Sequence, residues 1–170
     1  SDVCSSDLQI LKQIGANETQ AEGLFFPDTY YFAPNTSDRE ILKRAYITMQ
    51  GKINKAWAEK SEGLPYQTPY QALIMASIVE KETGKASERP QIAGVFINRL
   101  KVGMRLQTDP TVIYGLGEHF DGNLHKKDLL TDTAYNTYTR DGLPPTPIAM
   151  PGIDAIHAAL HPAPDRKSTR

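Results

Sequence analysis

The sequence predicts a single, mostly helical domain of the α+β class. The chain has 170 residues, of which 39% are hydrophobic and 23% charged, an ordinary composition for one soluble domain with a sizeable core. Apolar residues recur at three- and four-residue steps in several stretches, which is typical of amphipathic helices. From residue 103 to residue 150 turn residues interrupt these patterns, and long irregular stretches of this kind are often functional.

The first expected elements are an extended aromatic segment and a helix. Residues 22–34 combine aromatic side chains with prolines, which favours an extended conformation that packs across a neighbouring surface. Ser37 and Glu40 have the spacing of a capping box, in which each side chain satisfies a backbone amide at a helix start. We therefore expect an amphipathic helix over residues 38–60, with an apolar face made by Ile41, Leu42, Ala45, Met49, Ile53, Ala56 and Trp57.

A second helix is expected over residues 69–83. Thr68 is a suitable N-cap residue, Pro69 is favoured at the first helical position, and Gly84 ends the helix. The middle of this helix, Ala72–Val79, is apolar on almost every side. A helix with that pattern is buried in its domain rather than laid on its surface.

The later elements are shorter. A third helix is expected from Ser87 to Gly103, with inward-facing Ile92, Val95, Phe96 and Leu100. Thr108 begins a short helix, residues 115–122 form a loop, and residues 142–148 are rigid and extended because of their prolines. A last helix is expected over residues 152–160.

Two glutamates, Glu80 and Glu82, lie on the last turn of the expected buried helix, and residues two apart point to different faces. Counting back from Glu82 by three, four and seven residues meets only Val79, Ile78 and Met75. The same count from Glu80 meets Ser77, Ala76 and Leu73. Because apolar surroundings disfavour the ionised form of a carboxyl group, Glu82 is the better candidate for a general acid. Alternatively, both are solvated glutamates at a helix end.

Glycosidases usually use two carboxylates, and Asp109 is the nearest candidate for the second. The same aspartate precedes Pro110 and is also suited to cap the helix that begins there. Arg105, Gln107 and Asn98 could point polar groups into a cleft, and a solvated face is the alternative for each. Tyr135 and Asn136 belong to a Tyr-Asn-Thr-Tyr run whose flat rings and hydrogen-bonding groups are suited to sugars, although ordinary loops also contain these residues.

Other kinds of chemistry find little support. His157 and His161 have a spacing that can hold a metal, but no third ligand accompanies them, and the helix dipole favours histidine at a helix end. No phosphate-binding loop, zinc-protease pattern or nucleophile elbow occurs. The net charge of -1 provides no general attraction to nucleic acid. We therefore expect no metal, no cofactor and no nucleic-acid partner.

The two ends of the sequence differ in kind from the rest. Residues 2–8 can be back-translated to GAC GTG TGC TCT TCC GAT CT, and residues 165–170 to the reverse complement of that string. This relation predicts that residues 1–8 and 165–170 are scars of translated adapter DNA, which leaves residues 9–164 as the native segment. Cys4, the single cysteine, then belongs to a scar.

Six motifs occur in a fixed order along the chain. They are Gly23-Leu-Phe-Phe-Pro-Asp-Thr-Tyr30, Ala76-Ser-Ile-Val-Glu-Lys-Glu-Thr83, Val95-Phe-Ile-Asn-Arg-Leu100, Met104-Arg-Leu-Gln-Thr-Asp-Pro-Thr-Val-Ile-Tyr114, Tyr135-Asn-Thr-Tyr138 and Gly142-Leu-Pro-Pro145. In this order they resemble the endolytic murein transglycosylase family, the YceG-like proteins. The resemblance covers residues 20–164.

The resemblance implies a lytic-transglycosylase-type catalytic domain that lacks both flanks of the family. Members of the family usually have a membrane anchor and a LysM-like region upstream and a further segment downstream. They act on peptidoglycan glycan strands at the extracytoplasmic face of the bacterial inner membrane, in the periplasm where there is one. The implied parent protein is therefore membrane-anchored, and wall synthases are candidate partners.

The implied reaction is a lyase reaction. The bond between N-acetylmuramic acid and N-acetylglucosamine is cut without water and leaves a 1,6-anhydro-muramyl end. The catalytic glutamate of the family is the second in Glu-Lys-Glu, which falls on Glu82, with Glu80 as a supporting residue. A single carboxylate suffices because it can first give a proton and then take one. The alternatives are a lysozyme-like hydrolase and a non-catalytic wall-binding module.

Overall fold

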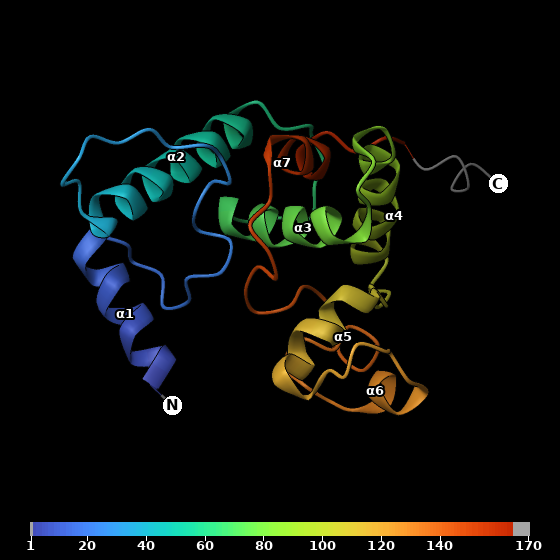
Figure 1. Ribbon diagram of the computed structural model, residues 1–170. Helices are drawn as coiled ribbons and strands as arrows, with labels where there is room; N and C mark the ends of the chain where they lie inside the picture. The colour runs from blue at the N-terminus through green and yellow to red at the C-terminus, as the bar shows by residue number, and fades with distance from the viewer. Residues whose placement is uncertain (1, 165–170) are drawn as a thin grey trace.

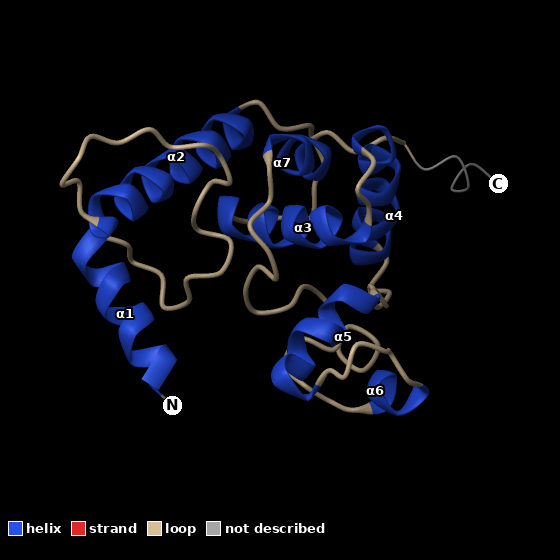
Figure 2. Cartoon of the chain, viewed as in Figure 1, coloured by secondary structure: helices blue, strands red, loops and turns tan. Residues whose placement is uncertain are grey.

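The computed structural model describes residues 2–164, and they form helices joined by loops (Figure 1). The helices are α1 (Asp2–Ile14), α2 (Asp38–Ala58), α3 (Pro69–Glu82), α4 (Arg89–Lys101), α5 (Asp109–Leu116), α6 (Lys126–Leu130) and α7 (Ile153–Leu160), with 3-10 turns η1 (Ala86–Glu88) and η2 (Gly117–His119). Within residues 2–164 there is no strand (Figure 2). The predicted helical character is confirmed, whereas the β part of the α+β expectation does not appear in this range.

Helix α3 is the centre of the fold, as its apolar sequence predicts. All residues of Ala72–Val79 are buried. The helix packs most extensively on α7, and also on α4 and α2, so that neighbouring helices cover it on several sides (Figure 1). Thr68 caps its first turn by accepting a 3.3 Å hydrogen bond from the backbone N–H of Gln71. The C-terminal end of α3 is less buried than its middle, since Glu80 is half-buried and Glu82 is exposed.

Helix α2 begins at the predicted capping box. The Ser37 hydroxyl accepts a hydrogen bond from the Glu40 backbone N–H, and the Glu40 carboxylate accepts one from the Ser37 backbone N–H. The extended aromatic segment runs beside this helix, because the Phe26 N–H donates to the Ala45 carbonyl at 3.1 Å. The same segment also lies against a part of the chain that is far away in sequence. A side chain at Gly23, where φ is +81°, would collide with Pro147.

Helix α4 starts two residues later than predicted, at Arg89, and it buries a different face from the one expected. Phe96 is buried as expected, but Val95 is 42% exposed, so its assignment to the inward face was wrong. The buried face instead includes Ala93, Gly94 and Ile97. Gly94 lies so close to the Ala163 carbonyl that a larger residue would not fit, and this contact holds the chain after α7 against α4. Val95 is thereby turned outward.

Helices α1 and α6 were not predicted. Leu11 and Ile14 of α1 are buried in the core, and α1 packs on α2. Helix α6 has only 5 residues, too short for an apolar period to reveal it. None of the described helices has the length and apolar character needed to cross a membrane.

We propose that residues 9–164 fold independently of the two terminal segments. A chain of residues 9–164 keeps the buried Leu11 and Ile14, so its free energy of unfolding should stay within about 1 kcal/mol of the 170-residue chain. Its melting temperature should then differ by no more than about 2–4 °C. Thermal and urea unfolding of both chains measure this. A larger loss would mean that residues 1–8 or 165–170 contribute to the fold.

Candidate active site

Glu82 is the last residue of α3, and its side chain is exposed at the rim of a pocket. This Glu82 pocket has a volume of about 240 Å³ and is lined by Glu82, Ile92, Val95, Phe96, Arg99 and Gln107. The predicted apolar stripe below Glu82 is fully buried in the core. The apolar residues that share the pocket with Glu82 come from α4 instead. The carboxylate is thus next to an apolar wall while remaining open to a ligand.

The exposed Val95 is part of the pocket wall. Ile92, Val95, Phe96 and Arg99 follow one another at three- and four-residue steps, so they form one face of α4. Arg99 closes this face and donates a hydrogen bond from Nη1 to the Leu106 carbonyl. The guanidinium therefore joins α4 to the segment that forms the opposite side of the pocket.

Glu80 has a different environment. Its Oε1 atom lies 3.0 Å from Arg89 Nη2, and its Oε2 atom accepts a 3.0 Å hydrogen bond from the Gly152 N–H. The Arg89 side chain is only 11% exposed. Glu80 therefore joins the end of α3 to the start of α4 and to the residue before α7. This is a structural contact, on another face of the helix from Glu82.

The segment before α5 forms the second side of the pocket. The Thr108 hydroxyl donates a 2.8 Å hydrogen bond to Glu82 Oε2. Gln107 lines the pocket and has a φ of 51°, an uncommon conformation for a residue other than glycine. Its backbone N–H donates to the Thr137 carbonyl at 3.1 Å. Gln107 thus reaches the pocket through a tight turn that the sequence did not indicate.

Asp109 is not the helix cap. Thr108 occupies the N-cap position of α5, and Asp109 is the first residue of the helix. The Asp109 carboxylate accepts a 2.6 Å hydrogen bond from the Tyr138 hydroxyl. Burial, this hydrogen bond and the negative charges of Asp109 and Glu82 raise the pKa of Tyr138 to about 12, against the opposing charge of Arg99. Tyr138 therefore stays protonated at neutral pH and remains a donor to Asp109.

Asn136 is a structural residue, contrary to the prediction that it contacts a substrate. It is fully buried, and its side-chain NH₂ donates to the carbonyl oxygens of Thr131 and Leu129 at 2.7 and 3.2 Å. Its side-chain oxygen accepts a 2.8 Å hydrogen bond from the Tyr138 N–H. These bonds occupy both the NH₂ group and the oxygen of the Asn136 side chain, so the side chain has no polar group left for a ligand. Asn136 instead organises the loop of residues 128–141.

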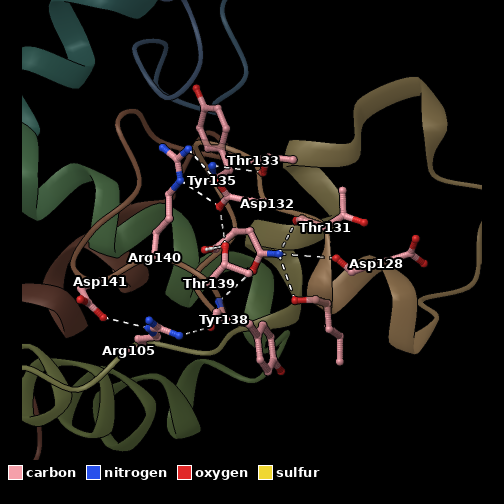
Figure 3. A network of polar contacts seen from close by, with 12 residues as sticks. Arg105, Asp128, Thr131, Asp132, Thr133, Tyr135, Tyr138, Thr139, Arg140 and Asp141 are labelled. Atoms are coloured by element: carbon pink, nitrogen blue, oxygen red, sulfur yellow. Dashed lines mark hydrogen bonds and ion pairs between the residues drawn. The ribbon is translucent and has the colours of Figure 1, made fainter.

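Charged pairs support the same loop (Figure 3). Arg140 bonds both oxygens of Asp132 at 3.0 Å, and with Thr139 it lowers the pKa of Asp132 to about 2. Arg105 joins Asp141 at 2.9 Å and the Tyr138 carbonyl at 2.9 Å. The irregular region expected from the sequence is therefore fixed by hydrogen bonds rather than by a regular element.

Tyr135 and Asn98 are not among the residues that line the Glu82 pocket. The Tyr135 hydroxyl lies 2.8 Å from Thr146 Oγ1, and its ring packs against Tyr114 with centroids 4.7 Å apart. Asn98 is half-buried on α4, next to the face that forms the wall. The structure thus brings Glu82 and Gln107 together, with Asp109 adjacent to Thr108, and leaves Tyr135 and Asn98 outside.

The sequence interpretation missed Arg99 and Thr108 as site residues. The signal for Arg99 was its position four residues after Val95, which was assigned to the core. Thr108 was assigned to the start of a helix, and that assignment concealed its contact with Glu82.

A larger pocket lies elsewhere and has a volume of about 530 Å³. Its lining residues are Pro65, Thr68, Tyr70, Gln71, Ile74, Leu100, Leu143, Pro144 and Pro145, with no carboxylate among them. Within the described part of the chain, no three His, Cys, Asp or Glu side chains are grouped to hold a metal. His157 and His161 stack with centroids 4.5 Å apart, and His161 Nδ1 lies 3.2 Å from Ser61 Oγ. The larger pocket therefore has no carboxyl group in its lining that could act as an acid, whereas the smaller pocket has Glu82.

Comparisons with known proteins agree on one family. The family model described as the YceG-like family matches residues 3–168. The chain is 43% identical to an endolytic murein transglycosylase of Bacillus subtilis, over 83% of this chain and 39% of that protein. It is 33% identical to an endolytic murein transglycosylase of Streptococcus pneumoniae, over 82% of this chain and 26% of that protein.

A solved structure has the same fold. The crystal structure of a yceG-like protein from Listeria monocytogenes matches with a TM-score of 0.74 and 35% identity, over 95% of this chain and 54% of that one. The chain spans only 39% and 26% of the length of the two curated relatives. The family match nevertheless covers nearly the whole sequence printed here. The chain belongs to the YceG-like family.

Proposed function

We propose that this chain carries the catalytic domain of an endolytic murein transglycosylase. The proposed reaction cuts the β-1,4 bond between N-acetylmuramic acid and N-acetylglucosamine inside peptidoglycan strands, without water. The observation that carries the proposal is the position of Glu82, exposed at the rim of a pocket with one carboxylate oxygen bound by Thr108. The names of the similar proteins from Bacillus subtilis and Streptococcus pneumoniae support the same activity.

Glu82 would act first as an acid and then as a base. In its protonated form it gives its proton to the glycosidic oxygen, and the bond from that oxygen to the muramyl anomeric carbon breaks. The muramyl O6 hydroxyl then attacks the anomeric carbon, a new C1–O6 bond forms, and the hydroxyl proton passes to Glu82. The carboxyl group returns to its initial state, so no water is consumed. The products are a free N-acetylglucosamine hydroxyl and a 1,6-anhydro-muramyl end.

The remaining side chains of the site have proposed roles in binding. Gln107 lines the pocket and can bond sugar hydroxyl or acetamido groups, since its amide both donates and accepts. Asp109 follows Thr108 in the chain and is exposed, which supports a role at the edge of the same site. Glu80 supports the end of α3 through Arg89. Asn98 is proposed to contact the strand only beyond the pocket.

A lysozyme-like hydrolase is the rival function. The observation that favours it is a second exposed carboxylate, Asp109, directly after Thr108. A hydrolase needs a second carboxylate, either as a base that activates water or as a nucleophile. In the described structure the Asp109 carboxylate is bonded by the Tyr138 hydroxyl at 2.6 Å. That hydrogen bond engages one oxygen of the Asp109 carboxylate with the protein itself, which favours the single-carboxylate mechanism.

Mass spectrometry of digested peptidoglycan tests the proposed reaction. The chain is incubated with polymeric glycan strands, and the new ends are analysed. We expect anhydro-muramyl ends, which are lighter by one water than hydrolysed ends. New reducing ends without anhydro product would identify a hydrolase, and binding of strands without any cleavage would identify a wall-binding module.

The cellular setting is also a proposal. Peptidoglycan lies outside the cytoplasm, so the site is expected to act at the extracytoplasmic face of the bacterial inner membrane. We propose that the parent protein is membrane-anchored and works beside wall synthases.

A further inference from the structure

Thr108 occupies a helix N-cap position but does not cap the helix. At the starts of α2 and α3 the N-cap hydroxyls of Ser37 and Thr68 each accept a 3.3 Å hydrogen bond from a backbone N–H. Thr108 has the extended backbone of an N-cap residue at α5, yet its side chain makes no capping hydrogen bond. A cap normally stabilises its helix, so this hydroxyl is directed to another partner at the expense of α5.

The other partner is the carboxylate of Glu82. An ionised carboxylate only accepts hydrogen bonds, so the Thr108 hydroxyl is the donor in the 2.8 Å contact with Oε2. Among the described residues no hydrogen bond reaches the other oxygen, Oε1. One oxygen of Glu82 is therefore held by the protein and the other is left for a ligand.

Buried threonines hold Thr108 in place. Thr108, Thr111 and Thr137 are at most 2% exposed. The Thr111 hydroxyl donates to the Thr108 carbonyl at 2.7 Å and lies 2.8 Å from the Thr137 hydroxyl. The Thr137 oxygen in turn accepts from the Thr108 N–H at 3.1 Å. The backbone of Thr108 is thus bonded through both its N–H and its carbonyl.

Thr137 also holds the turn at Gln107. Gln107 has a φ of 51°, and its N–H donates to the Thr137 carbonyl. Such a conformation is unfavourable for a residue with a side chain and persists only where its surroundings hold it. Here it turns the Gln107 side chain into the pocket and the Thr108 hydroxyl toward Glu82. The positive φ of Gln107 and the missing cap at the start of α5 therefore both contribute to the contact between Thr108 and Glu82.

We infer that Thr108 is a positioning residue for Glu82, and that Thr137 and Thr111 form the buried support that fixes it. The inference deepens the proposed function and rests on it for the effect on catalysis. By holding Oε2, Thr108 directs Oε1 toward the glycosidic oxygen and restricts rotation of the carboxyl group. Substrate binding does not depend on this hydrogen bond, so its loss lowers kcat with little change in KM.

The first experiment compares Thr108→Val and Thr108→Ser in the 170-residue chain with polymeric glycan strands. Valine keeps the shape and removes the donor, and we expect kcat to fall about 10- to 100-fold with KM within about twofold. Serine keeps the donor and should restore kcat to within about threefold of the wild-type value. Thr108→Ala is the second variant if valine disturbs the fold. A value of kcat for both Thr108→Val and Thr108→Ala equal to that of the wild-type chain would overturn the inference.

Thr68→Val is the matched control. It removes a threonine that does cap its helix, so it should lower the melting temperature without changing kcat. Thr108→Val loses no cap, and its larger effect should be on kcat. If both variants lost activity in proportion to stability, Thr108 would have only a structural role.

A second readout does not require activity. The carboxyl carbon of Glu82 is observed by 13C NMR at neutral pH and is assigned by its absence in Glu82→Gln. Thr108→Val should change its chemical shift, because Oε2 loses a hydrogen-bond donor, and Thr108→Ser should not. The charged or titratable groups around the site, Arg99, Asp109 and Tyr138, are unchanged in both variants.

The two readouts separate the proposals. A wild-type chain that leaves glycan uncut would remove the proposed function, while a changed chemical shift of the Glu82 carboxyl carbon in Thr108→Val would still support the positioning of Glu82. An active chain with the same kcat and the same chemical shift in Thr108→Val would keep the function and refute the inference.

Discussion

Replacement of Glu82 by glutamine should lower the rate of glycan cleavage by about 10²- to 10⁴-fold, the usual contribution of a general acid or base. Glutamine has nearly the same shape and can still accept the hydrogen bond from Thr108 through its side-chain oxygen. It cannot give or take the proton. Because the Glu82 side chain is exposed, we expect the melting temperature to change little. Rates are measured by release of soluble fragments from polymeric glycan.

Glu80→Gln is the matched comparison, because it makes the same chemical change two residues away. It should act mainly on stability, since it removes the nearer of the two carboxylates beside the Arg89 guanidinium, which is 11% exposed, and leaves only Asp154 at 3.8 Å. We expect a loss of about 1–3 kcal/mol in the free energy of unfolding, with most of the rate retained under folding conditions. Equal rates for Glu82→Gln and the wild-type chain would remove Glu82 from catalysis.

Local signals made much of the helical scaffold predictable. The capping box at Ser37 and the cap at Thr68 fix where α2 and α3 begin, and each involves residues only three positions apart. The unbroken apolar run Ala72–Val79 indicates a buried helix without knowledge of its neighbours. The same helix places Glu80 and Glu82 on different faces, and their separate environments follow from helix geometry alone.

The pocket depends on contacts that no local pattern records. Val95 is as apolar as a core residue, and its exposure follows from the close approach of Gly94 to Ala163, far along the chain. Thr108 is a residue type that suits an N-cap position. Only the position of Glu82 shows why its hydroxyl donates to a carboxylate instead of capping the helix. Periodicity reports which face of a helix is apolar, but not which neighbours cover it.

The Tyr-Asn-Thr-Tyr run illustrates the same limit in another way. Its residue types suit sugar binding, yet Asn136 and Thr137 are buried and hold the loop together. Tyr138 is the member that lies beside the carboxylates of Asp109 and Glu82. Composition alone therefore could not assign roles within this segment, because burial separates residues that are adjacent in sequence.

Asn136→Asp should be among the most destabilising single changes in the chain, with an expected loss of about 3–5 kcal/mol. The substitution places an oxygen where the side-chain NH₂ now donates to the carbonyls of Thr131 and Leu129. A buried carboxylate against carbonyl oxygens has no donor to balance it on that side. Urea unfolding measures the loss, and the melting temperature should fall by roughly 6–20 °C.

Asn98→Asp is the control, because the same change at a half-buried position with access to solvent should cost no more than about 0.5–1 kcal/mol. If both variants were equally stable, the hydrogen bonds of Asn136 would not hold the loop of residues 128–141.

The effect of Asn136→Asp should also reach Glu82. Asn136 bonds the Tyr138 N–H and precedes Thr137, whose carbonyl and hydroxyl hold the backbones of Gln107 and Thr108. A displaced loop would therefore release the donor to Glu82 as well as the partner of Asp109. At a temperature where the variant is still folded, we expect its kcat to fall to the level of Thr108→Val. Combining the two substitutions should then cost less than the product of their separate effects, because both act through the same hydroxyl. Multiplicative effects would instead mean that the loop and Thr108 influence the site independently.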